Sequence, residues 1–253
     1  MLERRDDLLT VTAIGLLGYL TADLAHHLLG HGTACLLEHG RILLLSSIVL
    51  RCSVQSVSID LSGPIGNFVI GLVACAVALQ RVRGIIKLLA ALTAGFNLFW
   101  FAGQLIVSVA TRSDDWAWAM ADNHVSETVR ILLIGIGVAL YLGVVRMLAA
   151  VLEDFAVPRE RLSRICRCAW LAATAVAALT ALLDQNPWGA LLKHALPQGV
   201  LSPLGLLLVA NRAAQHQSQT PQEIIARDRM WIGCGVLGIF MSLGFLGAGT
   251  ALG

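Results

Sequence analysis

Seven apolar stretches, each long enough to cross a lipid bilayer, follow one another along this chain of 253 residues. A helix needs about 20 mainly apolar residues to span the hydrocarbon core. The pattern therefore predicts an all-α polytopic membrane protein with about seven transmembrane helices, and it places the whole chain, 1–253, in a single membrane domain. The stretches cover approximately 8–30, 63–80, 85–111, 128–152, 168–184, 191–211 and 230–252.

The composition supports the membrane assignment. Only 13% of the residues are charged and 57% are hydrophobic, and the mean hydropathy is +0.76. Soluble domains carry about 25% charged residues, which they need for their surface. The formal net charge is +2, and the chain has no basic patch with interleaved aromatic residues, so nucleic acid is excluded as a partner.

Two segments depart from the pattern of plain spans. Residues 41–60, between the first two spans, are too short and polar to cross the membrane and are rich in β-branched residues. They predict a short β-like or re-entrant segment. The sixth stretch is interrupted by Pro197 and Pro203, which allows either two half-helices or a re-entrant piece.

The positions of lysine and arginine predict the orientation, because basic residues collect on the cytoplasmic side. Seven spans with a cytoplasmic N-terminus put all the main basic groups on that side. The outer side, predicted to face away from the cytoplasm of a bacterial inner membrane, then holds 31–62, 112–127, 185–190 and the C-terminus. The basic groups are Arg4 and Arg5; Arg81, Arg83 and Lys87; Arg159, Arg161, Arg164 and Arg167; and Arg212, Arg227 and Arg229.

Histidines concentrate at the outer end of the first span, at His26, His27, His31 and His39. On an α-helix His27 and His31, four residues apart, share one face with about 6 Å between their Cβ atoms. Two imidazoles at that spacing can hold one zinc ion. The alternative is an interfacial helix end at which the histidines reach towards water.

Six cysteines are dispersed along the chain. Cys35 and Cys52 both fall in the first outer connection. They could pair in an oxidising compartment, but the sequence leaves this open.

His27-Leu-Leu-Gly-His31 resembles the His-Glu-x-x-His helix of the site-2-protease-like intramembrane zinc metalloproteases. Gly40 and a short β-like stretch follow, and then Gly63-Pro64-x-x-Asn67 resembles the Gly-Pro-x-x-Asn turn of that family. The resemblance covers residues 15–75 and continues more weakly to about 150. It implies that Gly63, Pro64 and Asn67 are binding residues at the site.

The main departure from the family is Leu28, which stands where the family has its catalytic glutamate. That glutamate is the general base for the zinc-bound water, and such catalysis contributes about 10²–10⁴-fold in rate. A leucine cannot take or give a proton. The chain is therefore expected to be a pseudoenzyme, with Glu38 as the one candidate for a substitute base.

The resemblance also implies a third metal ligand, an aspartate on a later helix. The family's motif for it is absent, since Leu183-Asp-Gln-Asn-Pro187 has its elements in the wrong order. The predicted topology brings Asp115 to the same side as the histidine pair, and we take it as the third ligand, with Asp184 and His124 as alternatives. A solvated acidic loop is the competing interpretation of Asp115 and its neighbour Asp114.

These observations predict a degenerate relative of the site-2 proteases that retains a metal, zinc, at His27, His31 and Asp115. Its expected role is to bind a membrane protein or transmembrane segment as an assembly or regulatory subunit. One alternative is an active zinc metalloendopeptidase with a relocated base. A second alternative is a membrane subunit that conducts metal ions or protons.

Overall fold

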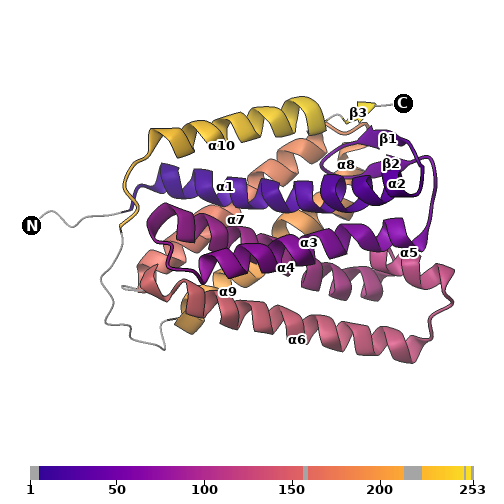
Figure 1. The fold of residues 1–253 in the computed structure, drawn as a ribbon, viewed down its shortest axis with the longest axis horizontal. Coiled ribbons are helices and arrows are strands. Elements are labelled where there is room, and N and C mark those ends of the chain that lie inside the picture. The colour runs from indigo at the N-terminus through magenta and orange to yellow at the C-terminus, as the bar shows by residue number, and fades with distance from the viewer. Residues whose placement is uncertain (1–5, 156–158, 214–223, 248, 252–253) are drawn as a thin grey trace, which may run out of the picture.

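The structure is a computed structural model that describes residues 6–155, 159–213, 224–247 and 249–251. Arg4 and Arg5 of the first basic group lie outside these residues. Six of the described helical segments are long and apolar enough to cross a membrane, and they confirm an all-α polytopic membrane protein (Figure 1). The six are Leu8–Leu37, Val57–Ala78, Gly84–Thr111, Glu127–Val151, Glu160–Leu182 and Arg229–Gly247.

The first span is longer than its apolar pattern predicts because the helix continues through the histidines. α1 (Leu8–Leu24) passes directly into a π-helix, η1 (Ala25–Gly32), and then into α2 (Thr33–Leu37). Its start is fixed by Asp7, whose carboxylate accepts a hydrogen bond from the backbone nitrogen of Thr10 at 2.9 Å.

The segment between the first two spans forms a β-hairpin, as its β-branched composition predicts. β1 (Ile42–Leu45) pairs antiparallel with β2 (Leu50–Cys52). A third strand, β3 (Thr250–Ala251), joins β1 on its other edge, so the sheet order is β2-β1-β3. This strand was not predicted, because the last apolar stretch reads as helix up to residue 252.

The second span begins earlier than the predicted residue 63. α3 (Val57–Ala78) starts after Ser56, whose hydroxyl caps the helix by accepting from the backbone nitrogen of Ile59 at 3.3 Å. Gly63 and Pro64 therefore lie inside the helix rather than at its start. Three helices follow, namely α4 (Gly84–Thr111), the short α5 (Asp115–Asp122) and α6 (Glu127–Val151).

The remaining helices include the proline-interrupted run. A 3-10 turn, η2 (Glu153–Phe155), leads to α7 (Arg159–Leu182). Four successive helical pieces follow; the first precedes the predicted sixth stretch and the other three form it, with Pro197 in η3 and Pro203 in η4. They are α8 (Pro187–Ala190), η3 (Leu191–Leu201), η4 (Ser202–Leu204) and α9 (Gly205–Ala213), and the last elements are α10 (Arg229–Met241) and η5 (Ser242–Gly247).

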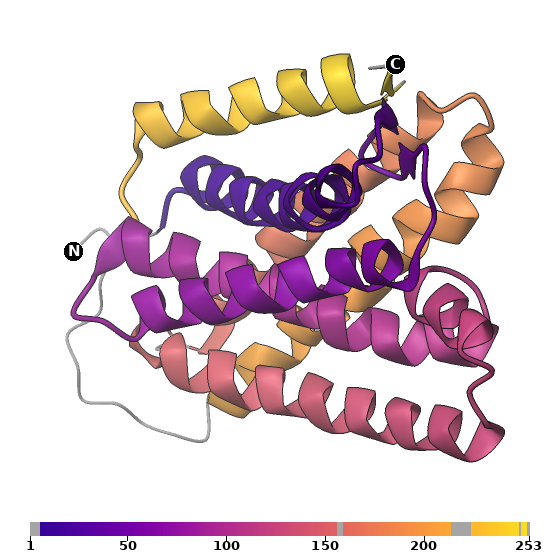
Figure 2. The same cartoon turned by 45° about the vertical axis from the view of Figure 1, so that its right-hand side comes forward.

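The connections predicted to share one side do gather at one end of the bundle. α2, the three strands, α5 and α8 all lie there, close to the C-terminus, while the N-terminus lies at the opposite end (Figures 1 and 2). At that opposite end Arg161 of α7 donates two hydrogen bonds to the Asp6 carboxylate, at 2.6 and 2.8 Å. The bundle thus has one end with strands and short helices and one end closed by a buried ion pair.

Small residues let the central helices approach closely. α1 packs against α4 and α7. A Cβ atom added at Gly15 of α1 would lie 2.5 Å from the Cα of Ala169 on α7, well inside contact distance. Such small residues are the usual means of close helix packing in membranes.

We therefore expect Gly15→Val to lower the free energy of unfolding by about 1–3 kcal/mol, the usual cost of overpacking. The matched control is Gly143→Val, because nothing lies within 4 Å of a Cβ atom placed there. Thermal unfolding of the two variants in the same detergent is the measurement. Equal midpoints for both would contradict the packing described.

Candidate metal centre

The π-helix η1 brings His26, rather than His27, against His31. A π-helix bonds residue i to i+5, so residues five apart stack on one another. The Nε2 atoms of His26 and His31 lie 3.2 Å apart, and the ring centroids are 4.8 Å apart. The rings of His27 and His31, the pair expected from α-helical spacing, are 6.1 Å apart.

Asp115, the first residue of α5, completes a compact group with this pair. Its Oδ2 atom lies 3.0 Å from Nε2 of His26 and 3.4 Å from Nε2 of His31. All three side chains are buried, with exposed fractions of 1% for His26, 8% for His31 and 3% for Asp115. We refer to these three residues as the triad.

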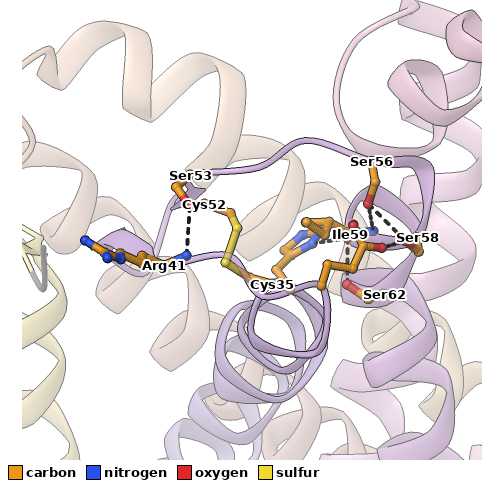
Figure 3. Close-up of a disulfide and its surroundings, with 10 residues drawn as sticks. Cys35, Arg41, Cys52, Ser53, Ser56, Ser58, Ile59 and Ser62 are labelled. Atoms are coloured by element: carbon orange, nitrogen blue, oxygen red, sulfur yellow. Dashed lines mark hydrogen bonds between the residues drawn. A yellow bond between two sulfur atoms is a disulfide. The ribbon is translucent and has the colours of Figure 1, made fainter.

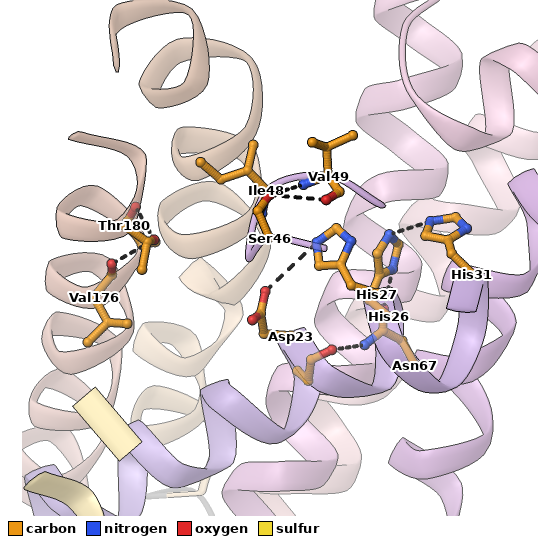
Figure 4. A network of polar contacts seen from close by, with 12 residues as sticks. Asp23, His26, His27, His31, Ser46, Ile48, Val49, Asn67, Val176 and Thr180 are labelled. Carbon is orange, nitrogen blue, oxygen red and sulfur yellow. Dashed lines mark hydrogen bonds and ion pairs between the residues drawn. The ribbon is translucent and has the colours of Figure 1, made fainter. Parts of the chain in front are cut away.

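Hydrogen bonds on the far side of each ring fix the tautomers. Nδ1 of His31 lies 2.7 Å from the carbonyl oxygen of Ile59, which can only accept, so this nitrogen carries the proton. Nδ1 of His26 lies 2.7 Å from Oδ1 of Asn67 (Figure 4). The Asn67 amide nitrogen already donates to the Ala22 carbonyl at 2.8 Å, so its oxygen must face His26.

When both rings are neutral, their Nε2 atoms therefore present lone pairs to each other and to a carboxylate oxygen. Three electron-rich atoms at these distances repel one another unless a cation lies among them. A histidine whose second nitrogen bonds a carbonyl or amide oxygen is also the usual arrangement for metal ligation. The donor set fits a bound metal ion, and the wider group of His26, His27 and His31 has ligand atoms within 4.8 Å of one another.

The residues around the triad leave room for its rings and bond its carboxylate. A Cβ atom on Gly63 would lie 2.4 Å from Nε2 of His31, so only glycine leaves room for that ring. Trp100 stacks on His26 with 5.0 Å between centroids. Gln104 donates to Oδ2 of Asp115 at 2.8 Å. Burial raises the pKa of Asp115, but the charges and hydrogen bonds of the two triad histidines outweigh burial and hold this pKa below its ordinary value.

A strained residue places Asp115. Asp114, which precedes α5, has φ 74° and ψ −178°, a region occupied almost only by glycine. Strain of this kind costs about 1–3 kcal/mol and persists where the surroundings enforce it. Burial and the adjacent Asp115 charge raise the pKa of Asp114, whose carboxylate accepts a hydrogen bond from Gln104 at 3.2 Å. The predicted alternative of a solvated acidic loop does not describe these two carboxylates, because Asp115 is buried and Asp114 is half-buried.

His27 points to a different partner. Its Nε2 atom lies 3.8 Å from Oδ1 of Asp23, which is too long for a hydrogen bond. Neither ring nitrogen has a hydrogen-bond partner among the described residues. Asp23 and His27 are both buried, with exposed fractions of 2% and 4%. His27 is thus a neighbour of the triad, displaced from it by the π-helical register.

The turn of the β-hairpin covers the histidines. Ser46 holds this turn, because its hydroxyl donates to the Val49 carbonyl at 3.0 Å and accepts from the Val49 nitrogen at 3.0 Å (Figure 4). Ile48 and Val49 line a pocket of about 60 Å³ together with the three histidines and Asp115. The hairpin thus forms one wall of the space next to the triad.

A disulfide fixes the hairpin to the helix that carries His31. Cys35 of α2 and Cys52 of β2 are bonded, with 5.9 Å between their Cα atoms (Figure 3). The backbone nitrogen of Arg41 donates to the Ser53 hydroxyl at 2.8 Å beside it. The sequence left this pairing open, and the structure resolves it.

The other predicted site residues lie elsewhere. Glu38 accepts a hydrogen bond from the Ser58 hydroxyl at the end of α2. Asp184 accepts from the backbone nitrogen of Asn186 at 2.7 Å, and His124 is exposed beyond α5 with φ 51°. Pro64 is buried within α3. Of the expected binding residues, Gly63 and Asn67 lie against the triad.

Sequence reasoning missed the role of His26 because it assumed α-helical spacing. The spacing of five between His26 and His31 was visible, but only packing decides whether a turn is α or π. It also missed His194 of η3, which lines the same small pocket. Comparison of the chain with protein-family models, with curated proteins and with solved structures gives no match.

Removing the amide that orients His26 should weaken metal binding without removing a ligand. We expect Asn67→Ala to raise the dissociation constant for a divalent metal about 10–100-fold, as is usual for outer-shell partners. Asn123→Ala, at an exposed position after α5, is the control. Competition titration with a chromophoric chelator measures both. Equal affinities would mean that Asn67 does not orient the ring.

Proposed function

We propose that this protein is an integral membrane metal-binding protein whose triad holds one zinc ion. The observation that carries the proposal is the triangle of ligand atoms, with sides of 3.0, 3.2 and 3.4 Å. Zinc bonds nitrogen and oxygen at about 2.0–2.2 Å, which gives a tetrahedral edge of roughly 3.3–3.5 Å. The triangle approaches one face of such a tetrahedron.

The arrangement supports a binding role over proteolysis. Zinc with three protein ligands acts in hydrolases together with a general base. Leu28 occupies the position of that base in the motif and is 41% exposed, on the outer surface of the helix. Glu38, the candidate substitute, is bonded to Ser58 instead. We therefore favour a subunit that binds a membrane protein or a transmembrane segment, and that resembles the site-2 proteases without their activity.

The alternative of a conducting subunit has weaker support. A path for metal ions or protons needs polar side chains at successive depths in the membrane. In the described part of the chain, apart from the Asp6–Arg161 ion pair at the opposite end, the buried acids and histidines concentrate at one end of the bundle, around Asp23, the three histidines and Asp115. This concentration favours a single binding site.

Single substitutions test whether the metal is held by the triad or by His27 and His31, the pair expected from α-helical spacing. We expect His26→Ala, His31→Ala and Asp115→Asn each to weaken zinc binding about 100-fold or more, since each removes a share of roughly 10–16 kcal/mol of binding free energy. We expect His27→Ala to bind zinc nearly as the wild type does. Metal content by mass spectrometry and titration calorimetry are the measurements.

His39→Ala, at an exposed histidine in the same region, is the matched control. Retention of a native unfolding midpoint shows that each variant is folded. If His27→Ala loses zinc while His26→Ala keeps it, the ligands are the α-helical pair and the proposed triad is wrong. If the wild-type protein takes up no metal, the whole proposal fails.

We further propose that the end with the triad faces an oxidising compartment outside the cytoplasm of a bacterial inner membrane. Basic residues gather at the opposite end, which the positive-inside rule assigns to the cytoplasm. The disulfide between Cys35 and Cys52 lies at the triad end, and disulfides persist in oxidising compartments.

Counting thiols tests this orientation. We expect four alkylated cysteines, Cys75, Cys166, Cys168 and Cys234, when cells are lysed into an alkylating agent, and six after reduction. The double variant Cys35→Ser/Cys52→Ser should give four under both conditions. Six alkylated cysteines before reduction would place this end in a reducing compartment. Intact-protein mass spectrometry gives the count.

A further inference from the structure

A second, larger cavity of about 540 Å³ adjoins the small pocket next to the triad. The two spaces meet at shared side chains, because both are lined by Val49, Asp114, Trp118, His194 and Gln198. Its volume lies in the range of about 300–1,000 Å³ that is usual for small-molecule sites. The metal site as proposed does not use this cavity.

The proline-interrupted helix supplies hydrogen-bond donors to the cavity. Lys193, His194 and Gln198, all on η3, line it. The Nδ1 atom of His194 is buried and has no hydrogen-bond partner among the described residues. The Gln198 side chain, 5% exposed, borders both spaces. Unpartnered buried polar atoms are uncommon, and they indicate a polar ligand group at this end of the cavity.

The charges around this end favour an anion. A divalent ion with two neutral imidazoles and the Asp115 carboxylate has a net charge of +1, and Lys193 adds another positive charge. Asp114 is the opposing acid on the wall, and its carboxylate accepts a hydrogen bond from Gln104 at 3.2 Å. These groups sum to one positive charge at the cavity, because Asp60 lines only the small pocket on the other side of the triad and not the cavity. A monoanion in the cavity beside Lys193 would neutralise this charge.

The rest of the cavity wall is mainly apolar. Most of the surface that it exposes is apolar and comes from side chains such as Trp100, Val107, Leu192 and Pro197, away from the residues shared with the small pocket. Polar side chains interrupt this surface at Gln104, Ser108, Thr111, Ser113 and Ser202. A polar end and an apolar body fit an amphiphile with one chain, and the bilayer around the protein is a source of such molecules.

We propose that this cavity binds the single alkyl chain of a fatty acid, with the carboxylate held by Lys193, His194 and Gln198 next to the triad. The chain lies along Trp100, Val107 and Leu192. The inference rests on the proposed function only for the part of the positive charge that the metal contributes. The donors of η3 and the apolar wall do not depend on the metal.

Quenching of tryptophan fluorescence tests the proposal, because Trp100 and Trp118 line the cavity. The full-length protein in nanodiscs of uncharged lipid is titrated with 11-bromoundecanoate, and with 11-bromoundecanol as the uncharged control. We expect saturable quenching by the acid and only the linear quenching of bilayer partition by the alcohol. In competition, octanoate should bind more tightly than hexanoate by about fourfold for each methylene group.

Two pairs of variants locate the binding. Val107→Phe on α4 should weaken acid binding about tenfold by filling the cavity, while Leu196→Phe, at an exposed position on η3, should not. Lys193→Gln should weaken it about two- to fivefold, as loss of a partly exposed ion pair does. Arg81→Gln, at the opposite end of the bundle, is the control for net charge.

The outcomes separate this inference from the metal proposal. Saturable, carboxylate-dependent quenching that Val107→Phe weakens supports the cavity site, and a further several-fold loss after chelation supports its coupling to the metal. Equal quenching by acid and alcohol, or equal binding by Val107→Phe and the wild type, overturns it. If zinc binds but saturable quenching is absent, the metal site stands and the fatty-acid site falls.

Discussion

The arrangement of side chains around the triad is governed by one constraint: a buried carboxylate faces the lone pairs of two imidazole rings. Asp115 and the Nε2 atoms of His26 and His31 lie within 3.4 Å of one another and are almost fully buried. Burying a charge without a partner is costly, and more so at the depth of a membrane span. Because each Nδ1 carries a proton that is donated elsewhere, only a cation can make the three remaining atoms attractive to one another. A metal ion or an added proton is therefore part of the stability of this end of the bundle.

Each neighbouring element is adapted to that constraint. The π-helical turn aligns two histidines five residues apart, and Gly63 of α3 leaves space for the His31 ring. The amide of Asn67 joins three elements, since it contacts His26, the Ala22 carbonyl and, at 3.0 Å, Oδ1 of Asn97 on α4. The strained backbone at Asp114 is the local cost of placing Asp115 at the same depth. The hairpin and its disulfide then cover a site already set by the helices.

The fold was predictable because long apolar stretches recur along the chain. The site depends on single residues and on the register of one helical turn, and no recurring sequence pattern reports these. Apolar stretches and basic residues sufficed for six of the seven predicted spans, all but the proline-interrupted stretch, and for the gathering at one end of the connections predicted to share a side. The predicted topology put both Asp115 and Asp184 on the side of the histidines, and the structure places Asp115, not Asp184, against them. The sequence could not predict whether His26 or His27 lies against His31. An α turn and a π turn differ by one residue in register, and only packing on α3 selects between them. Strand β3 was missed for a similar reason, since two residues carry no periodicity.

The same change in register bears on position 28, where the resemblance to site-2 proteases would place a catalytic glutamate. In an α-helix the residue after the first ligand of a His-x-x-x-His pair can turn towards the metal, which is where a general base is needed. Here the ligand is one residue earlier, and position 28 is exposed at 41% on the outer surface of the span. The leucine and the π-helical turn are therefore mutually consistent: a charged side chain at that position would face lipid without reaching the metal.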